Sequence, residues 1–473
     1  MRVFLKYFYF PLTLFAIDFI FGLQVYSNDF FGYLGLVTIM DLDDLSTFYN
    51  GVYPPGFVWV LKCILNFSDE VILLTKILNY LSLGLVFYFI SSKIFKELNF
   101  YLVFFCLVVL LVSNEIFLSN SLSPGSYGFF LVSLIVGTSH YEDRSKFSAL
   151  ISVSSLVIAT LFRFEAFIWL ICLWGSGLFF FSGHSKNLRG FLTIVLSVSV
   201  LFLINFWGTS SLVATKHFLT FEKPNWVELN PFTKFEKQSF YEFSLGYLNN
   251  LVRNVLYFST LIISWVFLKS FRRLILTCLF YLLLINFHPS PRGVFAILPF
   301  VYIFLGLLFF SIWERQKRVA VVLSIFLIPT FLYFSLSNYY HKRTSQVLQS
   351  SFKKIGKVIT RVDKSYSAES IFTNSHDFYI RDQLPDLPQV NGGWIKLIDR
   401  FYIKNPNFDL SHPNNFYDGL KSQKVKFLVI DKVLLHTSIY SQKDLLMFEE
   451  LGNSEFFNLI SLVDDRFMIY SVK

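Results

Sequence analysis

The sequence predicts a polytopic α-helical membrane protein that ends in a separate α/β domain. Of its 473 residues, 54% are hydrophobic and only 15% are charged, whereas a soluble domain carries about 25% charged residues. Apolar runs close to the roughly 20 residues that cross a bilayer recur along the first 337 positions. The remainder of the chain is more polar. The composition is therefore that of a membrane domain with an ordinary domain appended.

Eleven transmembrane helices are predicted, each an apolar run bounded by polar residues, glycine or proline. They cover residues 7–23, 71–91, 100–118, 127–140, 147–162, 164–181, 190–207, 251–268, 274–287, 293–312 and 319–337. The runs 127–140 and 274–287 are short for a complete crossing, so they are either re-entrant or extended into their flanks. No small-residue cleavage site follows the first run, which we therefore expect to be retained as a helix.

Basic residues predict the orientation of these helices. With a cytoplasmic N-terminus, every cytoplasmic loop is basic, through Lys93 and Lys96, Arg144 and Lys146, Lys186 and Arg189, Lys269, Arg272 and Arg273, and Arg315, Lys317 and Arg318. The opposite short connections hold only Arg163 and Arg292, as the positive-inside rule requires. These loops also account for much of the net charge of +9, so no nucleic-acid partner is expected.

An odd number of helices places the C-terminal tail outside. The predicted domains are a transmembrane domain, 1–337, and an extracytoplasmic α/β domain, 338–473. Two further outer segments, 24–70 and 208–250, are too long for simple connections and are where function is expected. Abundant Phe, Lys, Ile and Asn with little Gly and Ala are typical of an AT-rich bacterial genome, which favours a bacterial plasma membrane.

The tail shows both helical and strand periodicity. Its elements are an amphipathic helix carrying Val347, Leu348, Phe352, Ile355 and Ile359 on one face, strands at 370–373 and 425–430, and a hairpin of 458–463 with 467–472 that turns at Asp464-Asp465. Together these elements predict a small folded α/β domain.

The first outer loop carries two candidate features. Asp29 directly follows the first helix, where partial desolvation would raise the basicity of a carboxylate and suit it to accept a proton from a hydroxyl. The alternative is that Asp29 caps a short following helix. Tyr53 precedes Pro54-Pro55, which forces an extended bend. The apolar segment after this bend is predicted to lie along the membrane interface as an amphipathic helix.

Three basic residues are candidate ligands. Arg292 lies at the outer mouth of a helix, where a guanidinium suits the phosphate of a membrane lipid, or else snorkels to headgroups. Arg163 has the same two interpretations, with Glu165 as a local partner. Lys76 lies inside a predicted helix, as Asp18 does, and buried ionisable groups in membranes usually face a cavity or each other.

The sequence gives no support for a metal or cofactor. Its four cysteines lie in or near apolar runs, with no CxxC or Cys/His spacing, so neither a disulfide framework nor structural zinc is expected. His217 and His288 are each isolated in sequence. A divalent metal is compatible with the chain, but no residue pattern supports one.

Together these motifs resemble C-type (GT-C) membrane glycosyltransferases, specifically the bacterial members related to protein O-mannosyltransferases (family 39) and the lipid A aminoarabinose transferases. The likeness is carried by three motifs in the same order and on the same side of the membrane. They are Asp29 after the first helix followed by Tyr53-Pro54-Pro55, Arg163-Phe164-Glu165, and Pro291-Arg292 leading to Pro299. The resemblance covers the whole chain in layout, including the outer tail.

The resemblance implies transfer of a sugar from a polyprenyl-phosphate donor to a glycan, lipid or protein acceptor, with inversion, on the outer side of the membrane. It makes Asp29 the base and Arg292 a ligand of the donor phosphate. Arg163, Tyr53 and the intramembrane Lys76 are further candidate substrate-binding residues. Many relatives have Glu where this chain has Phe30. A paired-carboxylate metal site is therefore not expected.

Two other classes of function remain open from the sequence. A transporter or flippase of lipid-linked sugars would also have many helices, but it would not need the long outer tail, and no internal repeat is evident. A non-catalytic assembly subunit of envelope polysaccharide synthesis would tolerate loss of Asp29. A polymerase or ligase of lipid-linked glycans usually carries its principal outer loop late in the chain, whereas here a long one follows the first helix.

Overall fold

The computed structural model describes most of the helices and part of the tail. The described residues are 7–21, 33, 55–68, 71–141, 143, 145–163, 165–180, 190–200, 240–286, 291–319, 321–322, 324–325, 329, 333, 351, 354–364, 370–373, 413–422, 424–432, 451 and 454–473. The chain divides into two compact units. One comprises Met1–Ser27 with Leu42–Lys342, and the other comprises Asn28–Asp41 with Arg343–Lys473.

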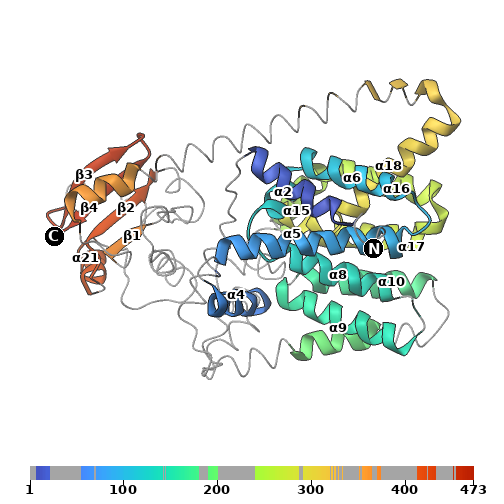
Figure 1. Ribbon diagram of the computed structural model, residues 1–473, viewed down its shortest axis with the longest axis horizontal. Coiled ribbons are helices and arrows are strands. Elements are labelled where there is room, and N and C mark those ends of the chain that lie inside the picture. The colour runs from blue at the N-terminus through green and yellow to red at the C-terminus, as the bar shows by residue number, and fades with distance from the viewer. Residues whose placement is uncertain are drawn as a thin grey trace. The chain divides into compact units, whose positions relative to one another are not determined.

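The first unit is built from helices (Figure 1). They are α2 (Tyr9–Phe21), α4 (Pro55–Phe67), α5 (Val71–Phe89), the π-helix η2 (Ile90–Ile94), α6 (Phe100–Ser113), α7 (Glu115–Leu122), α8 (Tyr127–Tyr141), α9 (Lys146–Phe162), α10 (Glu165–Phe180), a helix at Gly190–Val200, α15 (Phe240–Arg253), α16 (Val255–Phe267), η3 (Lys269–Phe271), α17 (Arg272–Ile285), the 3₁₀ helix η4 (Pro291–Ala296) and α18 (Leu298–Arg315).

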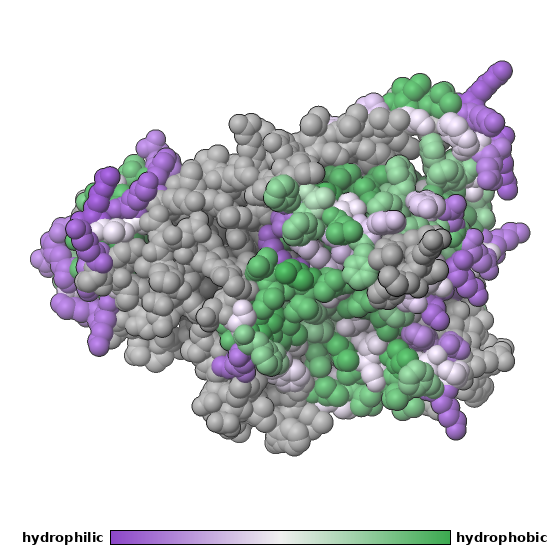
Figure 2. Space-filling view, viewed as in Figure 1, coloured by the Kyte–Doolittle hydropathy of each residue, from purple (hydrophilic) through white to green (hydrophobic). Residues whose placement is uncertain are grey.

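Several of these helices are suited to a bilayer. Within the described residues, Leu73–Ile94 and Leu298–Arg315 are long and apolar enough to cross a membrane, and the number rises to four if each of two bent pairs is one span. Five further apolar helices are 10–17 residues long. Large apolar side chains are exposed on this unit, for example Phe105 and Phe147, and Figure 2 shows apolar surface over its visible face. Such a surface is expected where lipid replaces water.

The helices pack closely through small residues and aromatic rings. A Cβ at Gly84 of α5 would lie 2.4 Å from Pro11 Cγ of α2, and a Cβ at Gly137 of α8 would lie 2.5 Å from Leu156 Cγ of α9. Since a real Cβ cannot approach so closely, glycine permits both contacts. Trp169 is fully buried and stacks on Phe300 at 5.6 Å. These contacts join both consecutive helices, α8 and α9, and helices far apart in sequence, α10 and α18.

The predicted single helix 100–118 is wrong. The chain turns by 95° between α6 and α7. Asn114 lies at the break in extended backbone conformation, and its side-chain oxygen accepts a hydrogen bond from Phe117 N at 2.9 Å. An asparagine that caps a new helix competes with continuation of the old one, which explains the bend.

The helices around 240–312 also differ from the prediction. The predicted outer segment 208–250 is helical from Phe240, because α15 begins there, and α15 and α16 meet at an angle of 67°. The predicted helix 293–312 begins as η4 and becomes α-helical only at Leu298, with proline in its first turn. Residues 201–207 and most of 319–337 lie outside the described residues, so the predicted total of eleven helices stays a prediction.

The second unit contains a four-stranded sheet of order β1-β2-β4-β3. The strands are β1 (Ile371–Thr373), β2 (Phe427–Asp431), β3 (Phe457–Val463) and β4 (Phe467–Val472), with β1 parallel to β2 and the other pairs antiparallel. The predicted hairpin is present, and it turns at Asp464 and Asp465, whose φ angles are 51° and 53°. Aspartate tolerates this left-handed conformation better than most residues.

Both faces of the sheet are covered. Ile355 and Ile359, from the predicted amphipathic helix, pack with strand residues on one face, and α21 (Pro413–Ser422) contributes Tyr417 and Leu420 to a core cluster on the other. Residues 347, 348 and 352 of the predicted helix lie outside the described side chains. The extracytoplasmic position of this unit stays a prediction.

Ion pairs join the elements of this unit. The carboxylate of Asp431 on β2 is inaccessible to solvent and accepts two hydrogen bonds from Arg466, at 2.8 Å from Nε and 2.6 Å from Nη2. At the hairpin turn, hydrogen bonds from Lys354 and Ser351 hold the pKa of the Asp464 carboxyl below its usual value. The turn is thereby tied to the helix that covers the sheet.

Candidate functional site

The first ionisable cluster joins α2 to α5. Lys76 Nζ lies 3.1 Å from Asp18 Oδ2, and the Tyr80 hydroxyl donates to the same oxygen at 2.8 Å. The side chains of Lys76 and Asp18 are only 12% and 19% exposed. The two intramembrane residues that the sequence singled out therefore meet and neutralise one another. Pairing of this kind lowers the cost of holding a charge among apolar helices.

Replacing Tyr80 by phenylalanine is expected to destabilise this cluster by about 1.5–3 kcal/mol, the range for a hydrogen bond to a charged group. The ring packing is retained, so the loss reports on the hydrogen bonds of the Tyr80 hydroxyl, mainly the 2.8 Å bond to Asp18 and also the longer contact of 3.4 Å with Leu122 O. Thermal unfolding in detergent would measure it, and Tyr88→Phe on the same helix is the matched control. Equal melting temperatures for the two variants would contradict the assignment.

The second cluster lies where α9 passes into α10. Arg163 follows the last residue of α9 in extended backbone conformation, and Glu165 begins α10. Arg163 Nε lies 3.1 Å from both carboxylate oxygens of Glu165, and Nη2 lies 2.6 Å from Oε1. The Arg163 guanidinium also lies over the ring of Tyr127, 4.1 Å from its centroid. This geometry combines a two-pronged ion pair with a cation–π contact.

The ring of Tyr127 also contacts η4, the element that contains Arg292. Tyr127 and Phe295 lie 4.9 Å apart in an edge-to-face arrangement, and Phe117 of α7 stacks on the same Phe295 at 5.0 Å. The Tyr281 hydroxyl donates to Gly293 O at 2.7 Å, which ties η4 to α17. The motifs Arg163-Phe164-Glu165 and Pro291–Pro299 are therefore brought together around Tyr127.

The turn between α7 and α8 lies between the two clusters. Tyr80 OH lies 3.4 Å from Leu122 O, and Asn79, its neighbour on α5, donates to Ser121 O at 2.8 Å. Tyr127, the first residue of α8, follows this turn. The sequence analysis missed Asn79, Tyr80 and Tyr127, and the only available signal was a polar side chain within an apolar helix.

The other predicted site residues are less completely described. Asp29 and Tyr53 lie outside the described residues. For Arg292 the backbone is described, as part of η4, but the side chain is not. Among the residues that the structure does describe, no group of three His, Cys, Asp or Glu side chains could hold a metal ion.

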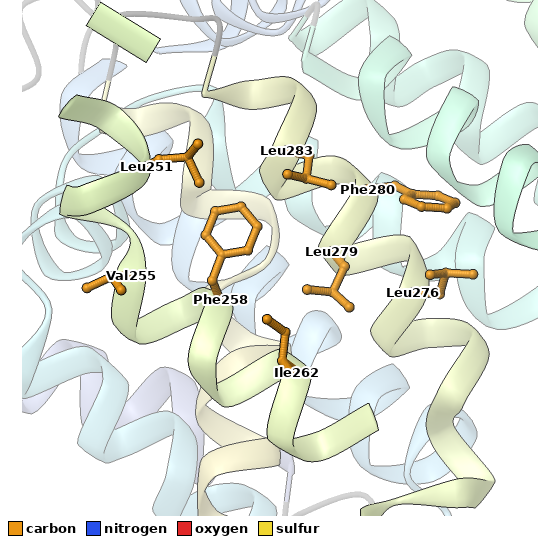
Figure 3. Close-up of a pocket in the computed structure, with 8 residues that line it drawn as sticks. All are labelled: Leu251, Val255, Phe258, Ile262, Leu276, Leu279, Phe280 and Leu283. Carbon is orange, nitrogen blue, oxygen red and sulfur yellow. The ribbon is translucent and has the colours of Figure 1, made fainter. Parts of the chain in front are cut away.

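An apolar groove lies between α17 on one side and α15 and α16 on the other (Figure 3). It has a volume of about 450 Å³. Its lining is Leu251, Val255, Phe258, Ile262, Leu276, Leu279, Phe280 and Leu283. The side of α17 that contacts η4 carries different residues, namely Tyr281 and Ile285. The groove has no polar lining atom, so a hydrocarbon chain is the chemistry that suits it.

Comparison with known proteins identifies the fold. No protein-family model and no curated protein matches the sequence. The chain is similar to the crystal structure of ArnT from Cupriavidus metallidurans bound to undecaprenyl phosphate, with a TM-score of 0.53 and 10% identity over 97% of both chains. It also aligns with the archaeal oligosaccharyltransferase AglB from Archaeoglobus fulgidus, in complex with an inhibitory peptide and a dolichol-phosphate, with a TM-score of 0.48 and 11% identity over 94% of this chain and 72% of that one.

At 10% identity, the similarity to ArnT shows the fold alone. The chain therefore shares the fold of ArnT, and the resemblance predicted from the sequence is confirmed for the fold. The apolar helices agree with a membrane protein. The choice of membrane and the orientation within it stay predictions.

Proposed function

We propose that this chain, whose fold is that of GT-C enzymes, is a membrane glycosyltransferase. It transfers a sugar from a polyprenyl-phosphate donor to an acceptor on the outer side of a bacterial plasma membrane, with inversion at the anomeric carbon. The acceptor is a glycan, a lipid or a protein. Asp29 is the base, and Arg292 is the principal ligand of the donor phosphate.

The observation that carries the proposal is the meeting of two motifs at Tyr127. Arg163 contacts the face of this ring while Phe295 of η4 contacts it edge to face. Arg163 and η4, the element that contains Arg292, thus meet at one ring although 129 positions separate Arg163 from Arg292 in the sequence. Because Glu165 pairs with Arg163, we assign recognition of the phosphate at the membrane surface chiefly to Arg292 of η4.

The proposed reaction needs two contributions from the protein. A lipid phosphate is a good leaving group once guanidinium groups offset the charge that it gains as the glycosidic bond breaks. The acceptor hydroxyl needs a base that takes its proton as the new bond forms. One displacement of this kind inverts the anomeric centre.

The remaining residues have supporting roles. Glu165 neutralises Arg163, and Asp18 neutralises Lys76. Neither pair carries a net charge, so each can contribute hydrogen bonds and packing but little net attraction for an anion. Arg292 is therefore assigned the main positive charge at the phosphate. Tyr53, next to Pro54-Pro55, is assigned to contact with the substrate. The groove lined by Phe258 and Leu279 provides apolar surface for part of the lipid chain.

Replacing Arg292 by alanine is expected to weaken donor binding by about 10- to 100-fold, because the phosphate loses a charge-assisted contact worth about 1.5–3 kcal/mol. The protein would be purified in detergent and assayed for transfer or hydrolysis of sugar from a panel of polyprenyl-phosphate monosaccharides. The effect should appear in the Michaelis constant for the donor. Arg292→Lys keeps the positive charge but loses the two parallel N–H groups of the guanidinium. Its Michaelis constant for the donor should lie between those of the native chain and Arg292→Ala.

The same assay tests the whole proposal. Sugar release from one donor of the panel by the native chain would support it and identify the sugar. Donor binding with no turnover in any sample would instead favour a transporter or an assembly subunit.

A further inference from the structure

We infer that Asn79 is a positioning residue of the proposed transferase, holding the turn between α7 and α8 so that Tyr127 lies under Arg163. This inference rests on the proposed function and assigns Asn79 no contact with substrate. Three observations support it: the hydrogen bonds of the buried Asn79 side chain, the absence of a Cβ at Gly128 beside it, and the contacts of the Tyr127 ring.

The amide of Asn79 donates hydrogen bonds at three points, two in the last turn of α7 and one at Ser123, which begins the turn to α8. Its Nδ2 lies 3.3 Å from Asn120 O, 2.8 Å from Ser121 O and 3.1 Å from Ser123 O. The side chain is inaccessible to solvent. Carbonyl groups that leave a helix end among apolar helices must be satisfied within the protein, because no water is available there. Asn79 on α5 donates the hydrogen bonds that these carbonyl groups need.

Glycine at position 128 leaves room for this amide. A Cβ added to Gly128 would lie 2.0 Å from Asn79 Oδ1 and 3.0 Å from the backbone oxygen of the same residue. The first distance is too short for a real methyl group and the second is tight, so any larger residue at 128 would displace the amide. Asn79 and Gly128 therefore form one close contact between α5 and the first turn of α8.

The held turn leads directly to the candidate site. Tyr127 immediately precedes Gly128, and its ring carries the Arg163 guanidinium at 4.1 Å and contacts Phe295 at 4.9 Å. Loss of the Asn79 hydrogen bonds would let the start of α8 shift. Both contacts of the ring would shift with it, and so would the positions of Arg163 and of η4, the element that contains Arg292.

Binding of undecaprenyl phosphate to the full chain in detergent tests the inference. Asn79→Ala is expected to weaken binding about tenfold, or about 1.4 kcal/mol. Thr75→Val is the matched control, because Thr75 is buried one turn earlier on α5 and, among the described residues, its hydroxyl donates to Val71 O of the same helix. This variant should leave affinity within about twofold. In an Arg163→Ala background, Asn79→Ala should cause no further loss, since the two residues act through one path.

Two further measurements complete the test. Amide hydrogen exchange in residues 120–127 should rise in Asn79→Ala and not in Thr75→Val. Gly128→Ala, which displaces the amide without removing it, should reproduce the loss of affinity if Asn79→Ala proves too unstable to purify. Affinity unchanged in Asn79→Ala, or losses that add with Arg163→Ala, would overturn the inference alone. No affinity in the native chain would overturn the proposed function, and the inference with it.

Discussion

Replacement of Asp29 by asparagine is expected to lower the turnover number for sugar transfer by about 10²- to 10⁴-fold, the usual contribution of a general base. The amide has the size of the carboxylate but cannot take the proton of the acceptor hydroxyl. Donor affinity should stay within about twofold of the native value, because the proposal places Asp29 at the acceptor and not at the phosphate. Steady-state kinetics with the donor identified by the panel would separate the two constants.

Asp43→Asn is the matched control for this experiment. It removes one carboxylate from the same outer segment of the sequence, 24–70, and no role is assigned to it. Its turnover number should equal that of the native chain. If Asp29→Asn kept full turnover, or if both variants lost activity equally, Asp29 would not be the base.

The second large effect is expected in the sheet-containing unit. Replacing Arg466 by leucine should destabilise this unit by about 3–5 kcal/mol, the cost of breaking a buried ion pair by removing one partner. The Asp431 side chain is 0% exposed, so its carboxylate would lose its guanidinium partner without gaining water. Since about 1.4 kcal/mol is tenfold in an equilibrium constant, amide exchange in β2 and β4 of the full chain should quicken by at least about 100-fold.

Lys354→Ala provides the comparison. It removes an ion pair with Asp464 in which the two side chains are 56% and 33% exposed. Solvent screens such a pair, so the expected loss is at most about 1 kcal/mol. Similar exchange rates in the two variants would show that the Asp431–Arg466 pair contributes no more than a surface pair.

Local chemistry made the hairpin and the helix after the proline pair predictable from the sequence. Alternating apolar residues on both sides of Asp464-Asp465 are sufficient to specify two strands and a tight turn. The apolar periodicity after Pro54-Pro55 likewise predicted the helix α4 (Pro55–Phe67). Whether α4 lies along the membrane interface stays a prediction.

Breaks within apolar runs were not predictable in the same way. The run 100–118 has the composition of one span, and the bend depends on whether Asn114 points to solvent or caps a new helix. In the structure its side chain caps α7 and also donates to the Tyr257 hydroxyl at 2.9 Å. That hydroxyl is 143 positions away in the sequence, so hydropathy alone contains no information about it.

The sequence by itself determined the membrane class of the protein, most of its helices, the strands of its tail, and which charged residues lie among apolar neighbours. Only the tertiary structure decided that Lys76 pairs with Asp18, that Tyr80 donates to the same carboxylate, and that the ring of Tyr127 lies under Arg163. The reason is physical. Apolar periodicity is a local property of the chain, whereas the partner of a buried charge depends on which helices pack together.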